Sequence, residues 1–298
     1  MGDEEVLARR FEEHRGQLRA VAYRMLGSLP EAEDAVQETW LKLTRTDPDA
    51  VRNLGAWLTT VTGRVCLDLL RARKARREEP MDDTFVPDPV IRPLTRTDPE
   101  QEVLQADSVG LALLVVLETL QPDERLAFVL HDLFAVPFDD IAPIVERTPA
   151  ATRQLAGRAR RRVQGATPSA DVDLGRQKEV LDAFLAASRG GDFEALVAVL
   201  HPDVVLRVDA GALVRDTAAS KVVQGAKTVA AQALTFAQYA RYARLVLVNG
   251  TVGLANAPEG RPLSVMGVTV ADGRITHMYI LADPERLEHL DLAGVLGD

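Results

Sequence analysis

The sequence predicts two all-α domains followed by an α+β domain with a curved, mainly antiparallel sheet. Three observations lead to this prediction. The chain has 298 residues, which is more than one typical domain needs. Its first 165 residues carry helical patterns, interrupted by five prolines between residues 77 and 100. Beyond residue 173 the apolar runs become β-type and flank Asn-Gly and Asp-Gly pairs, which are typical of tight hairpins.

The order of these patterns defines the expected domain boundaries. The proline-rich segment has the composition of an extended linker, and a second short linker follows the last helix of the all-α part. The expected segments are a helical domain (1–76), a linker (77–100), a second helical domain (101–165) and the α+β domain (171–298).

The composition excludes several classes of protein. Hydrophobic residues make up 47% of the chain, but no apolar run approaches the roughly 20 residues that cross a bilayer. The charged N-terminus lacks the apolar core of a secretory signal, so we expect a cytoplasmic protein with no membrane partner. A single cysteine, Cys66, excludes an internal disulfide and a zinc site built from cysteines. No pattern indicates a metal or a cofactor.

Positive charge is concentrated in two segments of an acidic chain. The net charge is −9, which by itself argues against binding to nucleic acid. Residues 64–77 nevertheless hold six basic side chains and one acid, and residues 147–162 hold six arginines and no acid. Two basic helical segments indicate two contacts with a polyanion, and two ordinary solvated faces are the alternative.

An acidic helix is predicted to begin after Ser28. Its apolar face carries Val36, Trp40 and Leu43. The opposite face carries Glu31, Asp34 and Glu38. This acidic face is free either to meet a partner or simply to be solvated.

Downstream, an aromatic side chain precedes the first basic helix. Trp57 follows Asn53 and stands just before the helix that contains Arg64 and Arg71. A stacking surface beside basic side chains suits the capture of single-stranded nucleic acid. Burial of Trp57 in the core remains an equal alternative.

The second basic segment shows the pattern of a helix-turn-helix. Helices are predicted to begin at Pro122, Pro137 and Thr148, with Pro143 falling inside the middle one. The third helix is the expected recognition helix. We expect Leu155, Ala159 and Val163 to point inward, and Arg153, Gln154, Arg158 and Arg161 to point outward.

These segments, in this order, resemble the extracytoplasmic-function (ECF) sigma factors. The segment Glu31–Leu41 is similar to the part of sigma that docks on the β′ clamp helices of RNA polymerase, and the segment after it to the part that melts and reads the −10 element. The resemblance implies a factor, not an enzyme, that binds the polymerase core, including its β flap, and promoter DNA. It assigns core binding to Asp34, Gln37, Glu38 and Leu41, the −10 element to Asn53, Trp57, Arg64 and Arg71, and the −35 element to Arg153, Gln154, Arg158 and Arg161. Many members carry Asn where Arg64 stands.

The C-terminal segment resembles the SnoaL-like cones, and the combination resembles the SigJ-like group of sigma factors. Three short stretches carry this likeness: Phe85–Val90 in the linker, Asp283–Leu287, and Asp209–Leu213, which keeps only one glycine of the glycine-rich loop found in the group. The resemblance implies that the domain regulates the factor through contacts with the linker. The residues concerned are Pro87, Asp88, Pro89, Asp209, Asp283, Pro284 and Arg286.

Cones of this type often enclose a pocket, which suggests a small-molecule ligand. His277 and Tyr279 are the polar side chains expected near it. Two alternatives follow from these features: a one-component regulator that senses a ligand and binds DNA, and an isomerase or hydrolase fused to a DNA-binding module.

Overall fold

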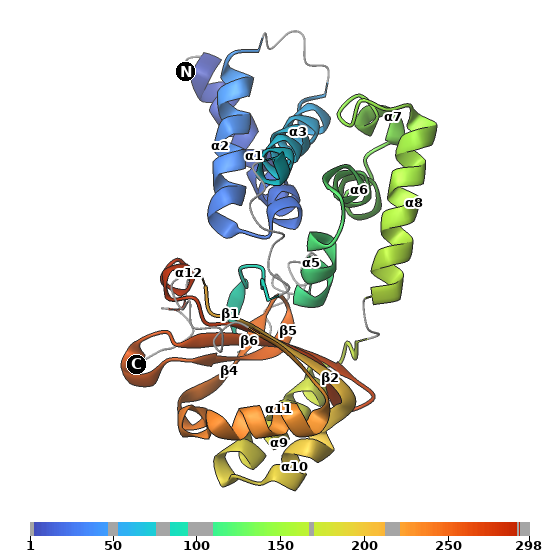
Figure 1. Cartoon of the computed structure of the whole chain (residues 1–298). Coiled ribbons are helices and arrows are strands. Elements are labelled where there is room, and N and C mark those ends of the chain that lie inside the picture. Colours follow the sequence, from blue (N-terminus) through green and yellow to red (C-terminus); the bar gives the residue numbers. More distant parts are fainter. Residues whose placement is uncertain are drawn as a thin grey trace. The chain divides into compact units, whose positions relative to one another are not determined.

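The computed structural model describes most of the chain. The described residues are 3–46, 53–75, 84–94, 110–166, 170–211, 221–290 and 292. The contacts divide the chain into two compact units (Figure 1). The helical unit comprises Met1–Pro80 and Val116–Ala166, and the C-terminal unit comprises Met81–Val115 and Thr167–Asp298. The described part of the predicted linker, residues 84–94, therefore belongs to the C-terminal unit.

The first part of the helical unit is a bundle of three long helices. They are α1 (Asp3–Leu26), α2 (Leu29–Thr44) and α3 (Leu54–Ala75). Leu18, Val36 and Leu58 lie in its core and are almost completely buried. The hydroxyls of Thr39 on α2 and Thr62 on α3 satisfy each other inside this core, 3.0 Å apart.

Shorter helices form the second part of this unit. They are α6 (Pro122–Phe128), the π-helical turn η2 (Val129–Leu133), α7 (Phe138–Ile141) and α8 (Pro149–Ala166). The long middle helix expected through Pro143 is wrong, because α7 ends at Ile141 and a proline cannot continue a helix. Glu146 adopts a φ of 55° in the turn that follows. As predicted, Thr148 caps α8, its Oγ1 accepting from the amide of Ala151 at 3.2 Å.

The C-terminal unit is built on one seven-stranded sheet with the order β1-β4-β5-β6-β7-β2-β3. All neighbouring pairs are antiparallel except β2 and β7, which are parallel. The strands are β1 (Ile91–Pro93), β2 (Leu200–Asp209), β3 (Lys221–Gln224), β4 (Ala243–Val248), β5 (Thr251–Asn256), β6 (Ser264–Ala271) and β7 (Arg274–Leu281). The two predicted hairpins are present, since Asn249-Gly250 and Asp272-Gly273 all have the positive φ that type I′ turns require.

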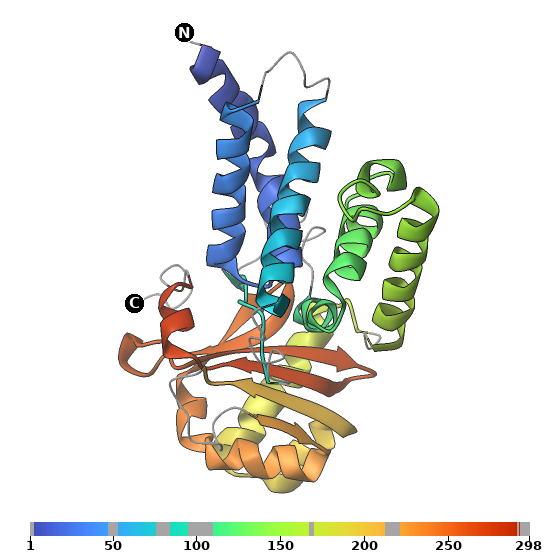
Figure 2. The ribbon, with the colours of Figure 1, turned by 45° about the horizontal axis from the view of Figure 1, so that its top comes forward.

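Three helices cover one face of this sheet (Figure 2). They are α9 (Leu174–Gly190), α10 (Phe193–Val199) and α11 (Ala226–Thr235), and the 3₁₀ turn η3 (Ala237–Tyr242) follows them. The core between helices and sheet includes Leu181, Leu196, Val229 and Ile275. The fold class predicted from the sequence is confirmed.

The described part of the linker, residues 84–94, runs along the C-terminal sheet. Its β1 pairs with β4 as an edge strand, with Ile91 opposite Val248. Beyond it, α5 (Leu111–Glu118) begins against the sheet. A Cβ at Gly267 on β6 would lie only 2.6 Å from Cδ1 of Leu111, so only glycine permits this approach. Pro80 and Pro99, two of the linker prolines, lie outside the described residues.

Candidate nucleic-acid and partner interfaces

The acidic face of α2 is exposed to solvent at the residues that the sequence singled out. Asp34, Gln37 and Glu38 are exposed, and Leu41 is 46% exposed although it is apolar. The opposite face packs into the bundle. The ion pair between Glu38 and Lys42, at 3.1 Å, lies on the surface and contributes little to stability. The structure thus leaves a polar surface with one apolar side chain available on α2.

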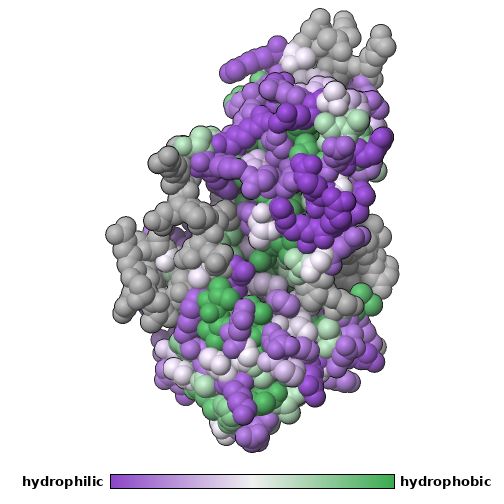
Figure 3. All heavy atoms as spheres, turned by 45° about the vertical axis from the view of Figure 1, so that its right-hand side comes forward, coloured by the Kyte–Doolittle hydropathy of each residue, from purple (hydrophilic) through white to green (hydrophobic). Residues whose placement is uncertain are grey.

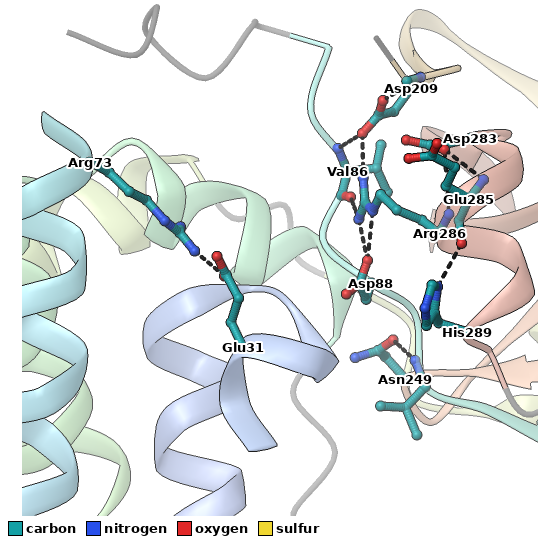
Figure 4. Close-up of polar contacts among 12 residues, drawn as sticks. Glu31, Arg73, Val86, Asp88, Asp209, Asn249, Asp283, Glu285, Arg286 and His289 are labelled. Atoms are coloured by element: carbon teal, nitrogen blue, oxygen red, sulfur yellow. Dashed lines mark hydrogen bonds and ion pairs between the residues drawn. The ribbon is translucent and has the colours of Figure 1, made fainter. Parts of the chain in front are cut away.

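Glu31 does not belong to this free surface. The sequence predicted it on the acidic face, but its carboxylate accepts a hydrogen bond from Arg73 on α3 (Figure 4). The side chain lies in the first turn of α2, close enough to the end of α3 for this pairing to form. The contact ties two helices of the bundle together.

The start of α3 brings Asn53 and Trp57 together. The Oδ1 of Asn53 accepts from the amide of Ala56 at 3.1 Å and thereby caps the helix. Trp57 is half-buried against the bundle core, so one part of its ring packs while another meets solvent. Arg64, two turns further on, is exposed.

Arg71, the fourth predicted −10 residue, is held by the second part of the helical unit. Its Nε and Nη2 donate to Oδ1 of Asp123 on α6, at 3.2 and 3.0 Å. A second contact lies nearby at Gly63, where a Cβ would be 3.0 Å from Cδ1 of Leu130. The basic helix α3 therefore packs closely against α6 and η2.

A buried arginine forms another link between the two parts of the helical unit, and no motif in the sequence pointed to it. Arg125 on α6 is 2% exposed. Its Nε and Nη2 donate to the carbonyl oxygen of Arg24 at the end of α1, at 3.1 and 3.0 Å, and its guanidinium pairs with Glu118. Its position directly before the apolar run 126–130 was the available signal, since a charge on a buried face needs partners.

The recognition helix α8 exposes Arg153, Gln154, Arg158 and Arg161. Its buried side is formed by Thr152, Ala156, Ala159 and Val163, and Leu155 is partly buried. The face that Figure 3 brings forward is largely hydrophilic over the helical unit.

Some arginines of α8 are already engaged within the unit. The buried carboxylate of Glu124 accepts from Arg158 at 2.8 Å and from Arg162 at 3.1 Å. The guanidinium of Arg153 lies over the ring of Phe138, 5.3 Å from its centre. These contacts orient the helix while Gln154 and Arg161 point away into solvent.

In the C-terminal unit, Arg286 binds the linker (Figure 4). It lies on α12 (Pro284–Glu288) and donates through Nε to Asp88 at 2.7 Å and through Nη2 to the carbonyl of Val86 at 2.6 Å. Its Nη1 donates to Asp209 at 2.7 Å, and its guanidinium covers the ring of Phe85. One arginine thus joins two buried carboxylates and the linker backbone.

The remaining predicted linker-contact residues support this arrangement, which we name the Arg286 cluster. Asp209 also accepts from the amide of Val86 at 3.0 Å. Asp283 caps α12 by accepting from the amide of Glu285 at 3.0 Å, with Pro284 in the first turn. Pro87, Asp88 and Pro89 are buried.

Gly211 lies beside the cluster and must be a glycine. Its φ is 76°, and a Cβ there would lie 2.3 Å from Oδ2 of Asp283. The loop expected to be degenerate therefore keeps the one glycine that this approach requires. Ala212 and Leu213 of the same loop lie outside the described residues.

His277 and Tyr279 do not line the cavity under the helices, so their assignment to the pocket is wrong. Neighbouring side chains of a strand point to opposite faces, and here Met278 and Ile280 face the cavity. The rings of His277 and Tyr279 stack on the other face, with centroids 6.1 Å apart. Burial lowers the pKa of His277 and raises that of Tyr279 to about 12.

The described part of the chain contains neither a metal-binding cluster nor a membrane-spanning helix. Within that part of the chain, no group of three or more His, Cys, Asp or Glu side chains is placed to hold a metal ion. No helix among those residues is long and apolar enough to cross a membrane.

Comparison with known families agrees with this geometry. The models for Sigma-70 region 2 and for Sigma-70, region 4 match residues 10–76 and 110–163. The bundle with its acidic face and the helix-turn-helix are therefore those of a sigma-70-type transcription-initiation factor.

Relatives along the whole chain define the family more closely. The ECF RNA polymerase sigma factor SigJ of Mycobacterium tuberculosis (strain ATCC 25618 / H37Rv) is 39% identical over 292 residues, covering 93% of this chain and 91% of SigJ. A probable ECF RNA polymerase sigma factor, SigI, from the same strain is 33% identical over 97% of this chain and 98% of SigI. The crystal structure of M. tuberculosis SigJ superposes with a TM-score of 0.76 at 36% identity, covering 96% of this chain and all of that one. The chain belongs to the ECF RNA polymerase sigma factors of the SigJ type and is not an enzyme.

Proposed function

We propose that this sigma factor docks on core RNA polymerase through the exposed face of α2, in the cytoplasm, and that its C-terminal domain controls it through the linker. Asp34, Gln37, Glu38 and Leu41 form the surface for the β′ clamp helices, and the helix-turn-helix meets the β flap. Their exposure supports this role, because the opposite face of α2 is buried in the bundle core and only this face is open to a partner.

Promoter recognition is assigned to the two basic helices. Asn53, Trp57, Arg64 and Arg71 of the α3 segment serve the −10 element. Arg153, Gln154, Arg158 and Arg161 of α8 serve the −35 element. The half-exposed ring of Trp57 suits stacking with an unpaired base, and exposed arginines suit guanine edges or phosphates.

The two helices cannot read both elements while they remain packed together. Elements centred near −10 and −35 lie about 25 base pairs apart, or about 85 Å along B-DNA at 3.4 Å per base pair. In the helical unit, Arg71 on α3 lies 3.0 Å from Asp123 on α6. The contacts of Arg71 and Arg125 must therefore break when both elements are bound.

The Arg286 cluster is the observation that carries the regulatory part of the proposal. The linker begins after α3 and leads to the second half of the helical unit, so its free length limits how far the two basic helices separate. Arg286 holds this linker at Asp88 and at the carbonyl of Val86. A domain that holds the linker can set that separation.

Transcription in vitro with purified core enzyme and a matched promoter tests both parts. Asp34→Ala with Glu38→Ala should reduce promoter-specific initiation by the full chain, whereas Glu13→Ala, an exposed acid on α1, should not. Arg286→Met should change initiation, and the exposed Arg274→Met serves as its control. Absence of initiation by the folded wild-type protein would refute the polymerase role.

A truncation after residue 168 gives a second test of the regulatory part. Equal activity of the truncated and full-length proteins, together with no effect of Arg286→Met, would refute it while leaving the polymerase role intact.

A further inference from the structure

A cavity of about 340 Å³ lies in the C-terminal unit between the curved sheet and its covering helices. Its volume is within the range of about 300 to 1,000 Å³ that is typical of small-molecule sites. Most of its lining is apolar and comes from α9, α11 and the strands β2 and β5 to β7. The side chains include Phe184, Leu206, Val229, Leu254, Met266 and Met278.

One buried polar atom in this lining has no hydrogen-bond partner among the described residues. This atom is Oδ1 of Asn256. The Nδ2 of Asn256 donates to Oγ of Ser264 on the neighbouring strand at 3.3 Å. A buried amide oxygen without a donor destabilises a fold, and such groups are rare unless a bound molecule satisfies them.

The described lining includes two titratable side chains, Lys221 and Tyr239. It contains neither a carboxylate nor an imidazole among the residues that the structure describes. His277, the expected acid–base group, lies on the other face of the sheet.

We propose that this cavity binds a small, mainly apolar molecule that carries a hydroxyl group, with the hydroxyl donating to Oδ1 of Asn256. The mainly apolar lining disfavours strongly polar or sugar-like molecules, because most of their polar groups would lose water without replacement, and Lys221 is the one charged side chain in the described lining. A hydroxyl is the smallest group that supplies the missing donor without adding a charge. The class is thus that of apolar alcohols and phenols.

The position of the cavity connects it to the Arg286 cluster. Ala210 and Ala282 line the cavity. Ala210 directly follows Asp209 and Ala282 directly precedes Asp283, and both acids belong to the cluster. The amide of Ala282 donates to the carbonyl oxygen of Asp209 at 2.7 Å. The occupant therefore contacts residues directly adjacent to Asp209, which accepts from the amide of Val86, and to Asp283, which caps α12.

Two probes of nearly equal shape test the proposal on the full-length protein. We expect 2-naphthol, followed by fluorescence titration, to bind about five- to tenfold more tightly than 2-methylnaphthalene, since one buried hydrogen bond distinguishes them. This wild-type comparison needs no variant. Failure of both probes to bind, or equal affinity for them, overturns the proposal.

Variants assign the preference to the proposed atom. Asn256→Leu should abolish the preference for the naphthol and raise the melting temperature of the free protein, because it removes the unsatisfied oxygen. Ala233→Phe, which adds a ring at the cavity wall, should weaken both probes. His277→Leu, on the opposite face, should leave both affinities unchanged. A preference that survives in Asn256→Leu, or is lost in His277→Leu, contradicts the assignment.

Discussion

Replacing Arg286 by methionine should detach the linker from the C-terminal unit. The variant keeps much of the aliphatic volume but removes the donors to Asp88, Asp209 and the carbonyl of Val86. The two carboxylates are only 6% and 9% exposed, so they would remain buried without their cation. Breaking a buried ion pair in this way costs about 3 to 5 kcal/mol.

Hydrogen exchange of the linker measures this loss directly. The amide of Val86 donates to Asp209 and the amide of Val90 donates to Asn249, so both are protected while the linker is bound. A loss of 3 to 5 kcal/mol corresponds to exchange that is faster by about 100-fold or more, since each 1.4 kcal/mol is a factor of ten. The readout is deuterium uptake of a peptide that covers residues 84–94.

The matched control is Arg274→Met, which removes an exposed arginine of the same unit. Surface substitutions of this kind usually change stability by less than about 0.5 kcal/mol, so the exchange of the linker should stay as in the wild type. Unchanged protection in Arg286→Met, or equal acceleration in both variants, would show that the Arg286 cluster does not hold the linker.

Three further predictions concern the helical unit. Asp34→Ala combined with Glu38→Ala should weaken binding to core polymerase by at least about tenfold in a pull-down or fluorescence titration, since it removes both charges of the docking face. Arg161→Ala should lower affinity for −35 duplex DNA and reduce the slope of log affinity against log salt by about one, because one phosphate contact is lost. Burial raises the pKa of Cys66 to about 12. Relative to Cys66→Val, the free energy of unfolding should therefore be independent of pH below the ordinary thiol pKa and should fall above it by about 1.4 kcal/mol per pH unit.

Each of these has a distinct contradicting result. Unchanged core affinity in the double variant would remove α2 from the interface. An unchanged salt slope would show that Arg161 contacts no phosphate. The free energies of unfolding of the wild type and Cys66→Val can be measured with denaturant between pH 8 and 11. If their difference stays constant over this range, the thiol titrates alike in the folded and unfolded states.

The local patterns were enough for the fold class and for the character of each helix face. The 3.6-residue period of α2 separates Val36 from Asp34 and Glu38, and burial follows this separation. Hairpin turns at Asn249-Gly250 and Asp272-Gly273 were predictable because few other residue pairs accept positive φ. Both signals lie within a few residues of the feature that they determine.

The errors arose where distant segments decide the outcome. Glu31 looked free until Arg73, 42 positions away in the chain, was placed beside it. The sequence gives no direct sign of which face of β7 the helices will cover, because strand alternation defines two faces without saying which one encloses the cavity. His277 was therefore assigned to the wrong side, and Asn256 was missed.

Local sequence patterns are sufficient to predict an acidic helix, two basic helices and a hairpin-rich domain, in the order of an ECF sigma factor. Periodicity, turn residues and local charge are properties of neighbouring residues, and they survive in any arrangement of the domains. Only the tertiary structure showed that Arg125 is buried between α6 and the end of α1, and that Arg286 joins Asp88 to Asp209. Arg125 and Arg24 are 101 positions apart in the chain. Arg286 is 198 positions from Asp88 and 77 from Asp209, and only folding brings such residues within hydrogen-bonding distance.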